Sequence, residues 1–549
     1  MVPFYHDQER KLLIYEAANS GLMLQHIPEA RQINGRYVAV PQTLRNSQVL
    51  RWLGHPVAPI MTDYDWPIEP GRTPGEHQKL MANFMVTNPK CFNLSDPGTQ
   101  KTLSALWAAD WLMQQFPKGE CRALIVGPLN VIETVWADAL WSNFLGRRTF
   151  EICYGAADKR LKALARKADF SIVNIDGVGV GARTYATDKH LRTSFVLDGF
   201  SKALAEDPDI KLVIIDEADG YVDSQTKRHK IARSVYAHMP YMWMMTGTPT
   251  SQRPDEAYGL GKMLNNAHGK SYKQFRDETM IQVSMYVWKP KKEGVERAYQ
   301  LLTPAIRFDL GEVWKNRPPL EGDDPLATAP PRRHKIALTE EQQKAVQTLK
   351  SSLQIELRSG KKITPANEAV ARGKLLQIIL GAVYDENHKA HVIDAEPRYA
   401  KIEEIIAQAE RKVLIFCPLT SVVNLLYERL RKQWGVGVIN GHVVPKARMA
   451  VISTYQKDPT NKVMIVDAQS VSHGINQFVV ASDVIWVAPI DKTRLYIQGN
   501  RRVYRPGQTG AVVVHHITAT ALEEQMYARL KSNTSMQGLL LDMVKKGEL

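Results

Sequence analysis

The chain has 549 residues, 44% of them hydrophobic, so it is long enough for about three or four globular domains. Its 71 Lys and Arg exceed its 57 Asp and Glu by 14 charges, which favours a polyanionic partner such as nucleic acid, although a generally basic protein would show the same excess. The four cysteines lie far apart, with no CxxC pair and no neighbouring His cluster, which excludes the sequence signatures of a disulfide framework and of a zinc site.

The first twenty residues contain early acidic side chains and no long apolar run after a basic start, so they do not resemble a secretory signal. No stretch reaches the roughly 18 consecutive apolar residues of a membrane-spanning helix. We therefore expect a soluble, intracellular, cytoplasmic protein without a membrane partner.

Residues 1–70 are predicted to form a small α+β accessory module. The runs KLLIYEA, LMLQHI and RYVAVPQ are typical of strands, and LRNSQVLRWLG is typical of a helix. A proline-rich stretch, residues 56–75, leads out of this module.

Residues 71–260 show a different rhythm, in which the short apolar runs ALIVG, FSIVNI, KLVIID and YMWMMTG alternate with helical stretches. This alternation predicts a parallel sheet with crossover helices. Residues 261–395 are helical and basic and are interpreted as a linker and insertion region. A second series of apolar runs, from KVLIFC to AVVVHHI, predicts another α/β lobe over residues 396–549.

The segment NLSDPGTQKTL, residues 93–103, follows the short strand-like run CFN and opens a helix. A phosphate-binding loop reads GxxxxGK[ST], because glycines let backbone N–H groups surround the phosphates while Lys and Ser or Thr reach the terminal phosphate and Mg²⁺. Here Lys101, Thr102 and a displaced Gly98 remain, and Gln100 stands where the motif has glycine. A loop-to-helix turn without a ligand fits this segment as well.

Two further strands are expected to end in polar residues at the same edge of the sheet. KLVIIDEADGY ends in Asp216 and Glu217, which can hold Mg²⁺ and orient a water for attack on a γ-phosphate. MMTGTP ends in a turn that contains Thr246 and Thr248. An acidic strand end and a turn without any ligand are the alternatives.

In the second lobe, QGNRRVYRPGQT is predicted to present Arg502 and Arg505 three residues apart on one face of a helix, before a Pro-Gly stop. Guanidinium groups so placed could neutralise charge on a transferring phosphoryl group. A solvated basic helix is the alternative.

The four features occur in one chain, and with them the sequence resembles the superfamily 2 helicases, in particular the Swi/Snf-type DNA translocases. The resemblance covers roughly residues 72–530. Its segments are TPGEHQKLMANFM, ALIVGPLNVIETVW, SIVNID, VIIDEADG, MMTGTPT, KVLIFC, GVGVINGHV, VSHGINQFVVASDVIWV and QGNRRVYRPGQT.

The resemblance implies two RecA-like parallel-sheet lobes with ATP in the cleft between them and nucleic acid across both. The implied catalytic residues are Asp216, Glu217, Arg502 and Arg505, and the implied Mg²⁺ ligands are Thr102 and Asp216. Nucleotide contacts are implied for Gln78, which reads adenine, and for Gly98, Thr99, Gln100, Lys101, Thr102 and Gly474. Contacts to DNA are implied for Pro128, Asn130, Thr248 and Asn476. Asn130 is also expected to cap the helix that follows Pro128.

The expected function is ATP-dependent movement along duplex or branched DNA without sequence preference, in replication, recombination or repair. The chain reads as a compact motor, encoded by a virus or a bacterium. Ser95 and Gln100 depart from the family pattern of glycines or small residues, and we expect the Gln100 side chain to point away from the triphosphate. A DEAD-box RNA helicase and a nucleic-acid clamp without turnover are the alternatives.

Overall fold

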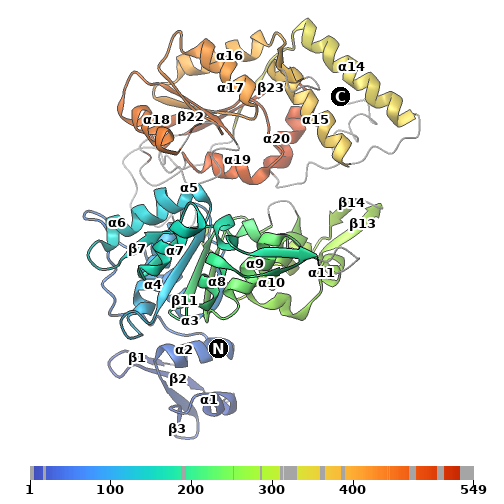
Figure 1. Cartoon of the computed structure of the whole chain (residues 1–549). Helices are drawn as coiled ribbons and strands as arrows, with labels where there is room; N and C mark the ends of the chain where they lie inside the picture. Colours follow the sequence, from blue (N-terminus) through green and yellow to red (C-terminus); the bar gives the residue numbers. More distant parts are fainter. Residues whose placement is uncertain are drawn as a thin grey trace. The chain divides into compact units, whose positions relative to one another are not determined.

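The computed structural model describes residues 5–16, 20–186, 193–250, 253–284, 287–309, 313, 331–358, 365–384, 390–441, 443, 445–468, 478–503, 508 and 512–531. The chain divides into two compact units (Figure 1). Unit 1 comprises Met1–Thr250, Pro254–Ile281 and Lys289–Arg317, and unit 2 comprises Ser251–Arg253, Gln282–Trp288 and Pro318–Leu549. The predicted boundaries at residues 70, 260 and 395 stay predictions.

Unit 1 begins with a small antiparallel sheet in the order β1-β2-β4-β3. Its elements are β1 (Tyr5–Asp7), β2 (Leu12–Glu16), α1 (Ser20–His26), β3 (Arg31–Ile33), β4 (Tyr37–Pro41) and α2 (Leu44–Trp52). The prediction of a strand for LMLQHI is wrong, because this run forms most of α1. Met23 and Ile27, four residues apart, are buried while Leu22 and Leu24 are exposed, which is the period of a helix.

The core of the small sheet ends near Val57, and the chain that follows packs on the larger sheet of unit 1. The Tyr64 hydroxyl donates to the buried Asp110 carboxylate at 2.7 Å, and the Trp107 indole donates to the Pro67 carbonyl at 2.7 Å. These two contacts fix the proline-rich stretch against helix α4.

The larger sheet of unit 1 has seven strands, all parallel, in the order β15-β5-β12-β11-β6-β8-β7. In that order the strands are β15 (Ala305–Ile306), β5 (Lys90–Asn93), β12 (Tyr241–Met245), β11 (Ile210–Asp216), β6 (Arg122–Gly127), β8 (Phe170–Asn174) and β7 (Phe150–Ile152). Central strands such as β11 are apolar on both faces because helices cover both.

One face of this sheet is covered by α3 (Glu76–Thr87), α4 (Lys101–Met113) and α6 (Asp138–Phe144), and the other by α7 (Ala157–Ala165), α8 (Gly199–Glu206), α9 (Lys227–Tyr236) and α10 (Ala257–Leu264). The remaining helices up to residue 309 are α5 (Leu129–Val131), the π-helical turn η2 (Ile132–Ala137), η3 (Ile175–Gly179), η4 (Ala218–Tyr221), η5 (Pro254–Glu256), η6 (Asn266–Gly269), α11 (Tyr272–Thr279) and α12 (Gly294–Leu301). A hairpin is formed by β9 (Arg183–Ala186) with β10 (Thr193–Val196). A second hairpin is formed by β13 (Met280–Ser284) with β14 (Val287–Pro290), and its residues Gln282–Trp288 belong to unit 2.

Unit 2 contains a second sheet of six parallel strands in the order β16-β23-β22-β19-β21-β20. The strands are β16 (Arg332–Lys335), β23 (Val513–Thr518), β22 (Ala481–Trp486), β19 (Lys412–Cys417), β21 (Val463–Asp467) and β20 (Val436–Ile439). The other elements are α14 (Glu340–Arg358), α15 (Pro365–Leu380), β17 (Ala382–Tyr384), β18 (Ala390–Val392), α16 (Glu396–Gln408), α17 (Thr420–Leu430), α18 (Pro445–Lys457), α19 (Thr493–Asn500) and α20 (Ala521–Lys531). The predicted α/β class with two parallel sheets is confirmed.

Two sets of buried polar side chains in unit 2 pair with one another. Arg398 on α16 and Glu523 at the start of α20 are almost fully buried and form an ion pair at 2.8 Å. On the sheet, His515 bridges Asp483 and His334, with a hydrogen-bond distance of 2.9 Å on each side. Such pairing stabilises polar groups that water cannot reach.

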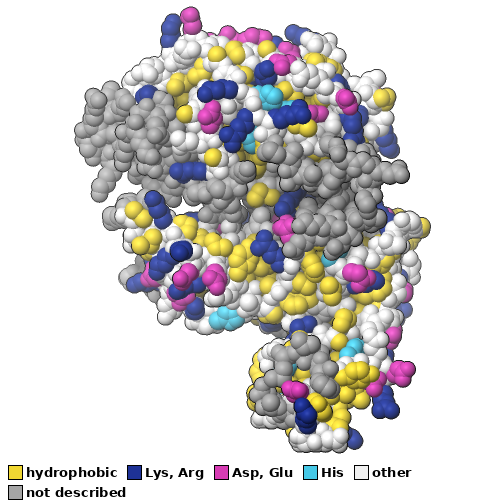
Figure 2. Space-filling view, turned by 180° about the vertical axis from the view of Figure 1, so that it is seen from behind, with side chains coloured by type: hydrophobic (Ala, Val, Ile, Leu, Met, Phe, Trp, Pro, Cys, Tyr) yellow, Lys and Arg dark blue, Asp and Glu magenta, His cyan; other side chains and the backbone are white. Residues whose placement is uncertain are grey.

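The surface carries both signs of charge. Figure 2 shows one face of the molecule, on which Lys and Arg side chains lie interspersed with Asp and Glu over both units. None of the helices described here is both long enough and apolar enough to cross a membrane. All four cysteines are buried as free thiols.

Candidate functional site

The candidate phosphate loop connects the end of β5 at Asn93 to the start of α4 at Lys101. Ser95 and Thr99 are fully buried inside it. The Thr99 hydroxyl donates to the Asp96 carbonyl at 2.8 Å, and the Lys101 ammonium donates to the carbonyls of Ser95 and Asp96 at 2.5 and 3.2 Å. The loop is therefore a closed turn, and its lysine lies at the first position of a helix of 13 residues.

Gln100 occupies the left-handed region of the backbone, with φ 60° and ψ 37°. A glycine reaches this region without strain, whereas a residue with a Cβ does so at a cost of roughly 1 kcal/mol or more. Gln100 thus adopts a backbone conformation that glycine favours, and the sequence departure at this position does not prevent the turn. The predicted direction of its side chain stays a prediction.

A neighbouring strand holds the phosphate loop along its length. The amides of Phe92, Leu94 and Asp96 donate to the carbonyls of Pro304, Ile306 and Phe308 at 2.8–3.0 Å. In return the Phe308 amide donates to the Ser95 hydroxyl at 3.1 Å. The Ser95 hydroxyl accepts a hydrogen bond that a glycine or alanine side chain could not, so this departure from the family pattern has a structural role.

Asp216 and Glu217 end β11, two strands from the phosphate loop in the sheet. Asp216 Oδ1 accepts from the Glu217 amide at 3.0 Å, and Oδ2 accepts from the Trp136 indole at 3.0 Å. Glu217 has φ 49° and ψ 51°, a strained backbone of the kind often found at functional sites. Burial and the Glu217 carboxylate raise the pKa of Asp216 to about 6, and the Trp136 hydrogen bond and the Lys101 ammonium lower it in part.

The turn after β12 lies between these two groups, because β12 pairs with both β5 and β11. The Thr246 amide donates to the Asn93 carbonyl at 3.1 Å. A Cβ on Gly247 would come within 2.5 Å of Pro97 Cδ, so only glycine allows the turn to approach the phosphate loop this closely. The Thr248 hydroxyl is buried and has no hydrogen-bond partner among the described residues.

Gln78 lies on the first turn of α3 and is 1% exposed. Its Oε1 accepts from the Gly75 amide at 2.9 Å, which fixes the orientation of the side-chain amide. Its Nε2 is buried and has no hydrogen-bond partner in the part of the chain described by the structure. A buried, unpaired donor is costly unless a ligand accepts its hydrogen bond, as a purine ring would.

These residues fit a nucleotide with Mg²⁺. Gln78 Nε2, which has no partner among the described residues, provides a donor for a base, and the helix start at Lys101 provides a cation and backbone N–H groups for phosphates. Thr102 follows on the first turn of α4, and Asp216 is a carboxylate whose raised pKa a nearby cation would lower. Hydroxyl and carboxylate oxygens are the ligands that Mg²⁺ prefers.

Of the predicted DNA contacts, Pro128 and Asn130 follow β6. Helix α5 begins at Leu129 with Pro128 in the cap position, and Asn130 lies inside the helix. The expectation that Asn130 caps this helix is therefore wrong. The proline, with φ fixed near −60°, already provides the extended residue that precedes a helix.

In unit 2, Gly474, Asn476 and Arg505 lie outside the described residues. Arg502 is described, but the prediction that it sits within a helix is wrong, because α19 ends at Asn500. The amides of Arg502 and Val503 donate to carbonyls three residues back, at 3.1 Å in both cases, which closes the helix with tight turns. The backbone already leaves α-helical geometry at the C-cap residue Arg501, which has φ −71° and ψ −2°.

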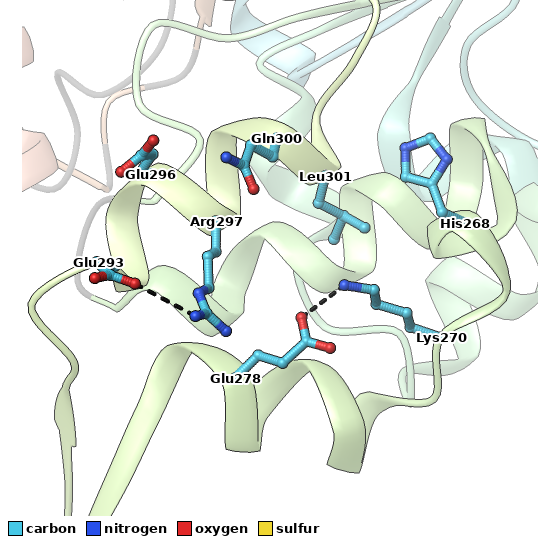
Figure 3. Close-up of a pocket in the computed structure, with 8 residues that line it drawn as sticks. All are labelled: His268, Lys270, Glu278, Glu293, Glu296, Arg297, Gln300 and Leu301. Carbon is cyan, nitrogen blue, oxygen red and sulfur yellow. Dashed lines mark hydrogen bonds and ion pairs between the residues drawn. The ribbon is translucent and has the colours of Figure 1, made fainter.

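A separate groove of about 590 Å³ lies in unit 1 beside α11, α12 and η6 (Figure 3). Its lining residues are His268, Lys270, Glu278, Glu293, Glu296, Arg297, Gln300 and Leu301. Two ion pairs lie among these residues, Lys270 with Glu278 at 2.6 Å and Arg297 with Glu293, four residues apart on α12, at 3.3 Å. None of the residues predicted for the site lines this groove, so we assign it no part in the chemistry.

Comparison with known proteins identifies the family. The sequence model of the SNF2-related domain matches residues 77–391, more than half of the chain.

Two curated relatives are the "DNA annealing helicase and endonuclease ZRANB3" of Mus musculus, 22% identical over 342 residues, and of Homo sapiens, 20% identical over 471 residues. These matches cover 60% and 83% of this chain but only 30% and 39% of the relatives. The "Uncharacterized ATP-dependent helicase YqhH" of Bacillus subtilis (strain 168) is 24% identical over 255 residues, which is 45% of this chain and 39% of that protein.

Among solved structures, the Sulfolobus solfataricus SWI2/SNF2 ATPase core in complex with dsDNA aligns over 88% of this chain and 95% of its own, with 19% identity and a TM-score of 0.37. The same core without DNA aligns over 87% and 93%, with 18% identity and a TM-score of 0.36. On the strength of the domain match, the chain belongs to the SNF2-related family, the Swi/Snf type of superfamily 2 helicases that its motifs predicted.

Proposed function

We propose that this chain is an ATP-dependent DNA translocase that couples ATP hydrolysis to movement along duplex or branched DNA. The observation that carries the proposal is the set of polar groups at three adjacent strand ends of one sheet, namely Lys101 after β5, Thr248 after β12, and Asp216 with Glu217 at the end of β11. A parallel sheet binds ligands at this edge.

The proposed roles follow from the chemistry of each side chain. Gln78 binds the adenine, and Lys101 turns from the loop carbonyls to the β- and γ-phosphates, with the loop residues Gly98, Thr99 and Gln100 around them. Thr102 and Asp216 hold Mg²⁺, which when bound neutralises charge on the phosphate oxygens. Glu217 orients the attacking water.

The second lobe completes the proposed site. Gly474 contacts the nucleotide, and Arg502 and Arg505 stabilise charge on the transferring phosphoryl group when the lobes close on ATP. Pro128, Asn130, Thr248 and Asn476 contact the DNA backbone, since phosphate contacts carry no sequence information. The name of the ZRANB3 relatives, DNA annealing helicase and endonuclease, favours a role on replication, recombination or repair intermediates. A viral or bacterial origin stays a prediction.

The test is the ATPase rate without nucleic acid and with single-stranded DNA, duplex DNA, forked duplex and single-stranded RNA. We expect duplex or forked DNA to stimulate the rate most, and stimulation to weaken steeply as salt rises because phosphate contacts release counterions. Equal rates under all five conditions would overturn the proposal, and stimulation by RNA alone would favour an RNA helicase.

Two variants serve as controls for the same assay. Lys101→Ala should abolish hydrolysis. Arg505→Ala should abolish the stimulation of hydrolysis by DNA while ATP binding remains. The reason is that an arginine from the second lobe contacts the transferring phosphoryl group only when the two lobes close on ATP. If the wild-type chain binds DNA but neither binds nor hydrolyses ATP, it is a clamp and not a motor.

A further inference from the structure

Trp136 is fully buried in unit 1 and donates its indole N–H to Oδ2 of Asp216 at 3.0 Å. We propose that Trp136 is a positioning residue that orients the Asp216 carboxylate and connects it to the DNA-facing segment 128–131. This inference rests on the proposed function, since it gives the proposed site a route by which DNA stimulates hydrolysis.

The orientation of the carboxylate follows from its two donors. The Glu217 amide binds Oδ1 and the Trp136 indole binds Oδ2, both at 3.0 Å. A carboxylate held at both oxygens cannot rotate freely about its Cβ–Cγ bond, so the lone pairs left for a metal ion keep a fixed direction. Loss of the indole donor would leave Oδ2 free to turn away.

The connection to DNA follows from the helix that carries Trp136. Strand β6 lies beside β11, and its last residue, Gly127, lies close to Asp216, since a Cβ there would be 3.6 Å from Asp216 Cβ. Helix α5 then begins at Leu129, next to the predicted DNA contacts Pro128 and Asn130, and continues without interruption into η2 and α6. A displacement of residues 128–131 by DNA therefore moves the same helical segment that holds the indole.

The helical segment that holds Trp136 also has a local feature that favours a change in the direction of the indole. Residues Ile132–Ala137 form a π-helical turn, which accommodates one more residue than an α-helical turn and occurs often at functional sites. Trp136 lies within this turn. The widened turn sets the direction of the indole, and a return to α-helical geometry would rotate the residues after it by about a quarter of a turn.

The test compares Trp136→Phe with Trp107→Phe. Both tryptophans are fully buried in unit 1 and donate one indole hydrogen bond, but Trp107 donates to the Pro67 carbonyl, so its replacement leaves Asp216 untouched. We measure the Mg²⁺ concentration that gives half-maximal binding of ADP by calorimetry, the affinity for duplex DNA, and the ATPase rate with and without that DNA. Thermal unfolding checks that each variant is folded, and Trp136→Tyr replaces Trp136→Phe if the latter does not fold.

For Trp136→Phe we expect the half-maximal Mg²⁺ concentration to rise about tenfold, the effect of losing a hydrogen bond to a charged group. The stimulation by DNA should fall about tenfold as well, while DNA affinity remains within about twofold of wild type. Trp107→Phe should change neither quantity by more than about twofold. If the two variants behave alike, Trp136 has a packing role only and the inference is wrong. If DNA does not stimulate even the wild-type chain, the proposed function fails, and the Mg²⁺ measurement still decides whether Trp136 orients Asp216.

Discussion

In the seven-stranded sheet of unit 1, polar side chains gather where β5, β12 and β11 end, whereas in unit 2 two sets of buried polar side chains, Arg398 with Glu523 and His515 with Asp483 and His334, pair with one another. The edge in unit 1 contains two residues in left-handed conformations, Gln100 and Glu217, and buried polar atoms on Gln78 and Thr248 that have no hydrogen-bond partner among the described residues. In the pair Arg398 and Glu523 of unit 2, the Glu523 carboxylate accepts from the Arg398 guanidinium and from the amides of Ala519 and Thr520, and only Arg398 Nε is without a partner among the described residues. The edge in unit 1 thus leaves hydrogen-bonding capacity for a ligand, whereas the contacts of this pair stabilise the fold.

The largest expected effect on stability comes from breaking the buried pair in unit 2. Glu523→Ala leaves the Arg398 guanidinium buried without its carboxylate and should lower the free energy of unfolding of unit 2 by about 3–5 kcal/mol. A urea titration, monitored by hydrogen exchange of the backbone amides of β22 and β23, measures this change in the free energy of unfolding. The control is Glu428→Ala, which breaks the exposed pair with Arg431 and should cost no more than about 1 kcal/mol. Equal losses in the two variants would contradict the contrast between the sheets.

The corresponding change in unit 1 should affect chemistry instead of stability. Glu217→Gln removes the carboxylate that we propose orients the attacking water, and it should lower ATP turnover by about 100-fold or more, roughly 2.7 kcal/mol, with ATP binding nearly intact. Steady-state hydrolysis and nucleotide titration measure the two quantities, and thermal unfolding of the same sample should be little changed. Near-normal turnover would remove Glu217 from the site.

Acid should weaken unit 2 through His516. Burial lowers the pKa of His516 to about 3, and its Nε2 lies 2.8 Å from the Tyr496 hydroxyl. Between pH 6.5 and 3 the unfolded chain binds a proton at this position and the folded chain does not, so stability falls as the pH falls, by up to about 1.4 kcal/mol per pH unit from this residue. His516→Gln should reduce by one the number of protons taken up on unfolding, which sets the slope of the free energy of urea unfolding against pH. Tyr496→Phe keeps the imidazole and should leave this slope unchanged. A slope that is the same with and without His516 would contradict the assignment.

The smallest expected effect is that of Gln100→Gly. Because Gln100 already has positive φ, glycine should preserve the turn and relieve its strain, and the Michaelis constant for ATP should change by no more than about tenfold, or 1.4 kcal/mol. Asn34→Gly, at an exposed residue with φ 51° in the small sheet, is the matched control for the backbone effect alone. If Gln100→Gly creates activity that the wild-type chain lacks, the natural loop is disabled.

Local patterns were sufficient to predict much of this site. The phosphate loop, the acidic strand end and the turn after β12 each depend on residues adjacent in sequence, and the order of apolar runs predicted that they would share one edge of a parallel sheet. The contact between Trp136 and Asp216 spans 80 residues, and that between Ser95 and Phe308 spans 213, so no local pattern indicates either. Two local predictions were also wrong. The run LMLQHI has strand-like composition but a helical burial period, and the helix expected at Arg502 ends two residues earlier, at Asn500.

The hydrogen bonds between β5, the phosphate loop and residues 304–308 have a mechanical consequence. Residues 304–308 are close to the end of the last segment of unit 1, which ends at Arg317, so the chain leaves unit 1 shortly after this ladder. The bonds of Phe308 with Asp96 and Ser95 are the contacts of the ladder nearest to this exit in sequence. Since the Lys101 ammonium binds the carbonyls of these same two residues, a displacement of the connecting chain at Phe308 reaches Lys101, the lysine proposed to bind phosphate, through two consecutive peptide units.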